Sequence, residues 1–150
     1  MGEADIKMTK DVIIQIKGKQ SYPEGEKLET VTEVAAEYYF RNGSHYVMYE
    51  EAEEGFKQGN KCMLKVHERY VELTKKGLVR SYMVFEEGKL HMTEYHTPFG
   101  MILLGVRTKS VEVMEGEETL TIHAEYALES NEELMADCKI QITIRERKEN

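Results

Sequence analysis

The 150-residue sequence contains no tryptophan, and cysteine and proline occur only twice each. Neither Cys62 nor Cys138 has a second cysteine or a histidine beside it at ligand spacing, which excludes a zinc knuckle and a Cys-x-x-Cys redox pair. Because disulfides are rare in a reducing cytosol, we expect two separately buried thiols. Pro23 and Pro98 fall between apolar runs, where a missing N–H costs no hydrogen bond of a strand ladder.

Long hydrophobic runs and an excess of basic residues are also missing. No segment approaches the roughly 20 apolar residues that a membrane helix needs, and Met1–Asp5 lacks the basic and then apolar order of a secretory signal. Lys and Arg number 20 against 28 Asp and Glu, a formal net charge of −8. This balance disfavours nucleic-acid binding, because phosphate contacts need clustered cations. We therefore expect a cytoplasmic protein with neither a membrane nor a nucleic acid as its partner.

Length and composition fit a single globular domain over residues 1–150. Hydrophobic residues make up 41% of the chain, close to the usual share in soluble proteins, so a core can form without disulfides or metals. No compositional break, low-complexity tract or internal repeat indicates a second domain. Disorder is excluded as the main state.

Alternation of apolar and polar residues at period two is the strongest pattern in the chain, and helical periodicity is scarce. Such alternation predicts strands with one buried face. The carboxylate-rich stretch Glu50–Gly59 is predicted to be a solvated loop, with a short helical turn as the alternative. The predicted strands are Asp11–Gln20, Leu28–Phe40, His45–Ala52, Lys61–Glu68, Val71–Lys75, Leu78–Phe85, Leu90–Thr97, Met101–Met114, Glu118–Leu128 and Leu134–Arg145.

Tight turns between these runs predict that successive strands are antiparallel neighbours. Asn42-Gly43, Glu87-Gly88 and Glu115-Gly116 supply the positive φ that short hairpin loops require. A meander this long, with no helix to cover one face, must keep exposed edges or close on itself. The expected fold class is all-β, an antiparallel up-and-down meander closing into a barrel of about eight to ten strands, which encloses side chains or one small ligand.

A central run of residues carries a family resemblance. From Gly88 to Gly100 the sequence reads Gly-x-x-His-x-x-x-Tyr-x-Thr-Pro-x-Gly, between Met83–Glu87 and Gly105–Thr108. With the opening Val12–Gly18 and the Asn42-Gly43 hairpin, this run resembles the YwiB-like family of small bacterial proteins, a domain of unknown function. The resemblance implies a calycin-like barrel, broadly similar to lipocalins and fatty-acid-binding proteins, and a cytoplasmic bacterial origin. It implies no established activity, and without tryptophan the chain lacks the lipocalin Gly-x-Trp signature, so no lipocalin ligand is carried over.

The predicted hairpin Leu78–Thr97 concentrates polar side chains, and its register decides which of them share a face. With a two-residue loop at Glu87-Gly88, Arg80 lies opposite Tyr95; with a three-residue loop, Arg80 faces Glu94 instead. We favour the first register because it separates polar from apolar side chains more cleanly. On one face it then places the predicted ligand-binding residues Arg80, Tyr82, His91, Tyr95 and Thr97.

Arg80 and Tyr82 also form an Arg-x-Tyr pair, similar to the carboxylate clamp of fatty-acid-binding proteins. In those proteins the pair lies on a late strand, whereas here it lies mid-chain. The structural alternative is that Arg80 pairs with a carboxylate or lies on the outer wall.

Other chemistries find little support. No two of the five histidines have the spacing that places both on one face as metal ligands; Glu94 and His96 share a face, but two ligands do not make a site. Ser81, Ser110 and Ser130 lie in no strand-turn-helix elbow. The paired carboxylates, such as Glu50-Glu51, lie near predicted turns, where we expect them to be solvated. We expect no metal and no cofactor.

Two functions are weighed. The preferred one is a non-catalytic barrel that binds a small apolar or anionic ligand, with the polar residues of the Leu78–Thr97 hairpin at the ligand's polar end. The alternative is a structural or interaction protein with a side-chain-filled interior, whose partner is another protein or a second copy of itself. An enzyme ranks third, because it needs a buried acid-base pair that the spacing does not reveal.

Overall fold

The structure, a computed structural model, describes residues 10–148, which form ten strands and no helix. None of these residues therefore belongs to a helix that could span a membrane. The strands are β1 (Asp11–Ser21), β2 (Lys27–Arg41), β3 (Ser44–Glu51), β4 (Asn60–Val66), β5 (Tyr70–Gly77), β6 (Ser81–Glu86), β7 (Leu90–Thr97), β8 (Gly100–Glu115), β9 (Thr119–Ser130) and β10 (Glu133–Glu146).

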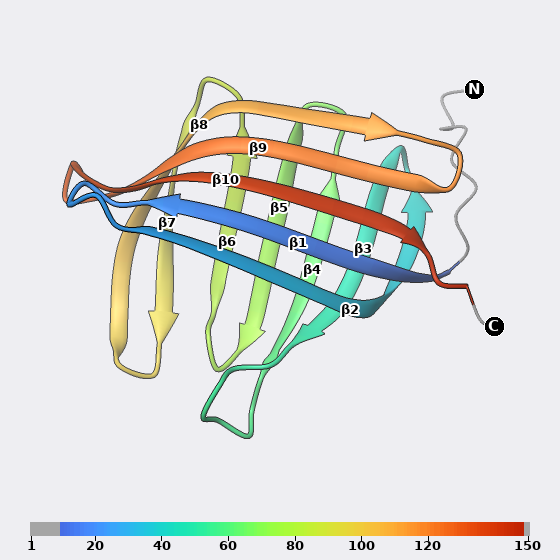
Figure 1. The fold of residues 1–150 in the computed structure, drawn as a ribbon, viewed down its shortest axis with the longest axis horizontal. Helices are drawn as coiled ribbons and strands as arrows, with labels where there is room; N and C mark the ends of the chain where they lie inside the picture. The colour runs from blue at the N-terminus through green and yellow to red at the C-terminus, as the bar shows by residue number, and fades with distance from the viewer. Residues whose placement is uncertain (1–9, 149–150) are drawn as a thin grey trace.

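All ten strands belong to one antiparallel sheet in the order β6-β5-β4-β3-β2-β1-β10-β9-β8-β7. Figure 1 shows how this sheet folds over itself: β9, β10 and β1 cross steeply in front of β4, β5 and β6, and the long strands β2 and β8 bend from one layer into the other. The last step of closure brings β6 near β7, through the backbone pair Arg80 and His96. The predicted all-β meander and its closure into a barrel are confirmed.

Alternating β-branched residues build the core between the two layers. Val12 and Ile14 of β1 are fully buried, and Ile14 lies opposite the equally buried Ile144 of β10. Burying a side chain of this size stabilises the fold by about 1.5–3 kcal/mol, and β-branched residues suit a pleated surface. From the other layer Val47, Leu64 and Val71 complete the same cluster.

Several local expectations are confirmed. Asn42 and Gly43 both have positive φ and join β2 to β3 as a two-residue hairpin, which places Tyr39 opposite Tyr46. The loop 52–59 contains no helical turn. Cys62 and Cys138 are separate, buried thiols.

The predicted pairing within Leu78–Thr97 is wrong in both registers. β6 pairs with β5 and β7 pairs with β8, and between β6 and β7 the described residues form a single bridge, from Arg80 to His96. The physical reason is that these strands lie at the two ends of a strongly curved sheet, each with its full ladder on the other side. They meet only where the barrel closes.

Candidate functional site

Three neighbouring strands end their inward-facing rows in polar residues. On β3, β4 and β5, the residues that alternate with buried apolar side chains include Glu51, Asn60 and Lys75. Because alternate residues share one face of a strand, these three lie at one end of the apolar interior. Together with Glu53 from the following loop and Ser81 of β6, they form what we call the interior polar cluster.

Lys75 and Glu51 form a close ion pair within this cluster. The Lys75 Nζ donates hydrogen bonds to Glu51 Oε1 at 3.1 Å and Oε2 at 3.0 Å, and the two side chains are only 20% and 23% exposed. Burial alone would lower the pKa of Lys75, but the negative charge of Glu51 outweighs it, and the pKa of Lys75 is raised. The ammonium therefore stays charged inside the wall. The expectation that the Glu50-Glu51 carboxylates are solvated is wrong for Glu51.

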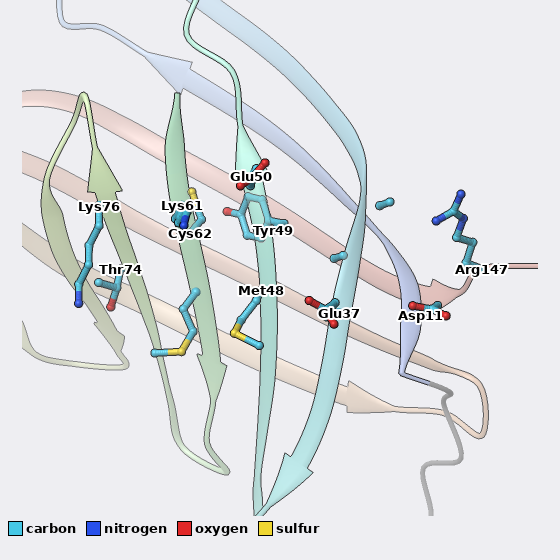
Figure 2. A pocket seen from close by; sticks show the side chains of 13 residues that line it. Asp11, Glu37, Met48, Tyr49, Glu50, Lys61, Cys62, Thr74, Lys76 and Arg147 are labelled. Atoms are coloured by element: carbon cyan, nitrogen blue, oxygen red, sulfur yellow. The ribbon is translucent and has the colours of Figure 1, made fainter. Parts of the chain in front are cut away.

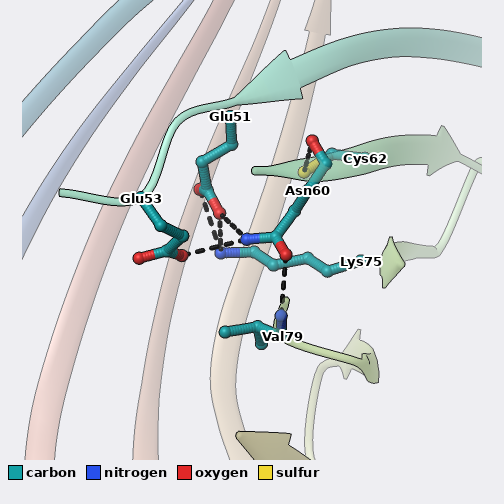
Figure 3. Close-up of polar contacts among 6 residues, drawn as sticks. All are labelled: Glu51, Glu53, Asn60, Cys62, Lys75 and Val79. Atoms are coloured by element: carbon teal, nitrogen blue, oxygen red, sulfur yellow. Dashed lines mark hydrogen bonds and ion pairs between the residues drawn. The ribbon is translucent and has the colours of Figure 1, made fainter. Parts of the chain in front are cut away.

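Asn60 ties the ion pair to the surrounding backbone (Figure 3). Its Nδ2 donates to Glu51 Oε1 at 3.0 Å and to Glu53 Oε1 at 2.9 Å, and its Oδ1 accepts a hydrogen bond of 2.7 Å from the Val79 N–H. Asn60 is 3% exposed. One buried amide thus fixes the start of the loop 52–59, the end of β3 and the segment between β5 and β6.

Two glycines let the backbone segments around Asn60 come this close. A Cβ on Gly77 would lie 2.3 Å from the Gly59 carbonyl oxygen, and a Cβ on Gly59 would lie 2.3 Å from the Glu51 carbonyl oxygen. Both distances are far inside van der Waals contact, so any larger residue must push the segments apart. The geometry of the cluster therefore depends on these glycines.

Ser81 is the incompletely satisfied member of the cluster. It lies opposite Lys75 in the β5–β6 ladder, is 8% exposed, and its buried Oγ has no hydrogen-bond partner among residues 10–148. An unpaired buried polar group is costly and calls for an explanation such as a bound ligand or water. Tyr95 of β7 lies near enough for its phenol to act on the pKa of Lys75. Lys75, Ser81 and Tyr95 thus bring three hydrogen-bond donors to one end of the interior.

A groove of about 480 Å³ lies outside the cluster, beneath the loop 52–59. Glu51, Glu53 and Asn60 line it together with the exposed Phe56 of the loop. The acidic side of the cluster therefore borders a surface hollow, whereas Lys75 and Ser81 are not among the residues that line it.

The five residues predicted to share one face are divided between two faces. Tyr82 lies on the outer face, 49% exposed, where its hydroxyl donates to Glu72. This hydrogen bond raises the pKa of Tyr82 to about 12. Arg80 alternates with the buried Ser81 and is likewise exposed on the outer wall. The structural alternative for Arg80 is therefore observed in part. Arg80 lies on the outer wall, and its backbone is joined to β7.

The three predicted residues of β7 lie on its inward-facing row. Tyr95 is half-buried near Lys75. His91 lies opposite the buried Val106, and its Nε2 is 2.9 Å from Glu86 Oε1. Thr97 is used locally, since its Oγ1 donates to the Gly100 carbonyl at 2.9 Å in the β7–β8 turn. Of the predicted set, the structure therefore brings only Tyr95 to the interior polar cluster.

A second buried polar group lies elsewhere in the wall. The Nδ1 of His45 is 2.8 Å from the Tyr38 hydroxyl, and its Nε2 is 3.5 Å from Glu115 Oε1. His45 is 3% exposed, and this burial lowers its pKa. The negative charge of Glu115 acts to raise the pKa but does not outweigh burial. Burial likewise raises the pKa of Tyr38 to about 12. These polar atoms are paired with one another.

The outer surface carries a further groove of about 570 Å³ over β2 to β5 (Figure 2). Met48 and Met63 are its large apolar lining residues, and Figure 2 shows Lys76 at one end and Asp11 and Arg147 at the other. Neither this groove nor the one beneath the loop 52–59 is lined by Arg80 or His91.

Sequence reasoning missed the interior polar cluster, although a signal was present. In the run Val71-x-Leu73-x-Lys75 the lysine falls on the apolar face, and Val47-x-Tyr49-x-Glu51 places a carboxylate in the same way. An opposite pair of charges at the ends of two inward-facing rows predicts a buried ion pair.

Comparison with known proteins places the chain in a family. Residues 14–142 match the family model described as Domain of unknown function (DUF1934). The chain belongs to this family. Its fold is also similar to the crystal structure of the ywiB protein from Bacillus subtilis, with a TM-score of 0.82 and 21% sequence identity over 93% of each chain. A comparison with curated protein sequences gave no match. Membership of the family, predicted from the Gly88–Gly100 run, is confirmed.

Proposed function

We propose that this protein is a small-molecule-binding barrel that holds the polar end of an amphipathic ligand at Lys75, Ser81 and Tyr95. The observation that carries the proposal is the buried Ser81 Oγ, which has no partner although it lies opposite a buried lysine. Leaving such a hydroxyl unsatisfied costs about 1–3 kcal/mol, which a ligand oxygen in the interior would offset.

The donors define the chemistry of the ligand's polar end. An ammonium has three N–H bonds, and the Lys75–Glu51 pair uses two of them. The remaining N–H and the hydroxyls of Ser81 and Tyr95 suit a carbonyl or carboxylate oxygen. Because Glu51 already offsets the charge of Lys75, these donors favour a ligand of one negative charge or none.

The neighbouring inward-facing side chains suit an apolar remainder. Phe85 follows Ser81 on the inward-facing row of β6 and is 3% exposed, with its ring 4.8 Å from the ring of Tyr126. The flexible, half-buried Met83 lies between them on the same row. A short hydrocarbon chain or a ring would enter there by displacing the flexible Met83, because Phe85 belongs to the packed core.

Native mass spectrometry and thermal shift across fatty acids and anionic metabolites test the proposal. We expect bound mass or a rise in Tm for the wild type, and a smaller rise for Lys75→Met and Ser81→Ala. The matched control is Lys76→Met, because Lys76 is the next residue of β5 and is exposed on the outer face. The proposal fails if no compound shifts the wild type, or if both variants respond to the panel as the control does. A Ser81→Ala variant that is more stable, with an unchanged panel, would mean that the hydroxyl holds only water.

A second candidate function is self-association through the β7–β8 hairpin, as favoured by one observation. Phe99 at the turn is 90% exposed, and Met92, Met101 and Leu103 of the two strands are all more than half exposed. Exposed apolar side chains gathered on one hairpin are typical of contact sites. Light scattering of the wild type and of Phe99→Ser tests it: a concentration-dependent dimer that the substitution abolishes supports this function, and a monomer at all concentrations removes it.

A further inference from the structure

The seam between β6 and β7 is the weak line of the barrel wall. Every other pair of neighbouring strands shares a ladder of at least six paired residues, whereas these two share the single bridge of Arg80 and His96. At that bridge both residues exchange N–H···O hydrogen bonds, 3.0 Å and 2.9 Å long. Within the described residues, no other backbone pairing joins the two strands.

The unused backbone groups of the seam follow from antiparallel alternation. Since Arg80 directs its N–H and C=O toward β7, Tyr82 and Val84 do so too, and the residues between them bond to β5. On β7, Glu94 and Met92 point toward β6 for the same reason. Two facing rows of donors and acceptors therefore run along the seam without joining.

A side-chain contact holds the other end of the seam. The Nε2 of His91 on β7 is 2.9 Å from Glu86 Oε1 on β6. The hydrogen bond with His91 lowers the pKa of Glu86, with a smaller contribution from Lys89. The seam is thus joined at one end by the backbone bridge of Arg80 and His96. At the other end the turn Glu87–Lys89 connects the strands, with the Lys89 N–H donating to the Glu86 carbonyl at 3.0 Å and His91 contacting Glu86 beside it. Within the described residues, no ladder joins β6 to β7 between these ends.

The seam leads to the interior polar cluster. Ser81 and Tyr95 are the chain neighbours of the bridged residues Arg80 and His96, so the two hydroxyls lie just inside its fastened end. On the outside, Tyr82 is 49% and Met92 57% exposed, which gives the seam an apolar rim. An amphipathic molecule would find apolar surface at the rim and hydrogen-bond donors behind it.

We propose that the β6–β7 seam is the gate through which an amphipathic ligand passes sideways into the barrel, with the His91–Glu86 contact as its latch. The inference rests on the proposed function and adds the ligand's route. Opening costs few hydrogen bonds, because the two strands can bow apart between the Arg80–His96 bridge and the turn Glu87–Lys89 when the latch and side-chain packing yield, while every ladder stays intact.

A reversible crosslink tests the gate. Extending the register of the Arg80 bridge places Tyr82 and Glu94 on opposite sides of the seam on the outer face, so Tyr82→Cys with Glu94→Cys supplies two thiols for a reducible crosslink across it. The matched control is Gln15→Cys with Glu33→Cys, an outer-face pair within the β1–β2 ladder. The probe is 1-anilinonaphthalene-8-sulfonate, an anionic amphiphile, and stopped-flow fluorescence gives its rates of binding and release.

The oxidised seam crosslink should slow both rates by about tenfold or more, with the wild-type rates restored by reduction and the control crosslink without effect. His91→Ala should speed release, whereas His96→Ala should not, because His96 contacts Glu94 of its own strand. If the crosslink leaves both rates unchanged, the seam is not the route of the ligand, whereas the proposed function is unaffected. If the wild type does not bind the probe, or binds it equally after Lys75→Met, the proposed function fails.

Discussion

Asn60 offers the sharpest test of how the interior polar cluster is held together. In Asn60→Ala the Val79 N–H, in a residue only 7% exposed, loses its acceptor, and such an orphaned donor costs about 1–3 kcal/mol. The two hydrogen bonds from Nδ2 to carboxylates also disappear, but Glu51 keeps Lys75 and Glu53 can turn to solvent, so their loss lies at the low end of the usual range. At about 0.5 kcal/mol for each of these two hydrogen bonds, we expect a total loss of about 2–4 kcal/mol, a large part of the 5–15 kcal/mol that is typical of a whole domain.

Urea denaturation with a constant m value measures this loss directly. Asn60→Asp separates the two sides of the amide, because it keeps an oxygen for Val79 but turns a carboxylate toward Glu51 and Glu53. That variant should be destabilised at pH 7 and should recover part of the loss at pH 4, where carboxylates begin to protonate, while Asn60→Ala should not. A loss below about 1 kcal/mol for Asn60→Ala would refute the reasoning.

Three further predictions concern the buried groups. Because burial lowers the pKa of His45 below 6.5, the unfolded state binds more protons, so stability should fall as the pH drops from 6.5 toward that lower pKa; urea titrations at several pH values should show this slope reduced in His45→Gln. Gly77→Ala, which must displace the Gly59 carbonyl, should cost about 1–3 kcal/mol, seen as a lower Tm; an unchanged Tm would contradict the close approach. Burial raises the pKa of the Cys62 and Cys138 thiols to about 11, so both should resist a disulfide reagent at pH 8 in the native state and react fully in urea; rapid native labelling would count against their burial.

The strands and their order follow from the sequence because period two is a local property. The alternation from Val12 to Ile16 fixes which side chains of β1 face inward, and Asn42-Gly43 fixes the register of the next hairpin through its positive φ. Neither requires knowledge of distant parts of the chain. The same local reasoning indicates the sheet's closure, because a ten-strand meander without helices must deal with its edges.

Reasoning about the Leu78–Thr97 segment failed because its geometry is set by the whole sheet. The Glu87-Gly88 turn has the residues of a tight hairpin, and Gly88 has the expected positive φ, yet the flanking strands diverge. Curvature accumulated over all ten strands decides how β6 meets β7, and no short window of sequence contains it. The interior polar cluster was missed for a related reason: Glu51, Asn60 and Lys75 each look ordinary within their own strand, and only the register across β3, β4 and β5 shows that they meet.

The polypeptide chain and the hydrogen-bonded sheet are interrupted at different places in the fold. Residues 11 and 147 lie near opposite ends of the chain, but a backbone hydrogen bond of 3.1 Å joins them beside the continuous β1–β10 ladder. At Glu87-Gly88 the chain is continuous, but no ladder joins β6 to β7. A circularly permuted polypeptide, spliced between residues 11 and 147 and opened at Glu87-Gly88, would retain every strand ladder. In that rearranged chain the new termini would lie at the gap between β6 and β7, where no ladder has to be interrupted, while the Arg80–His96 bridge would still close the barrel.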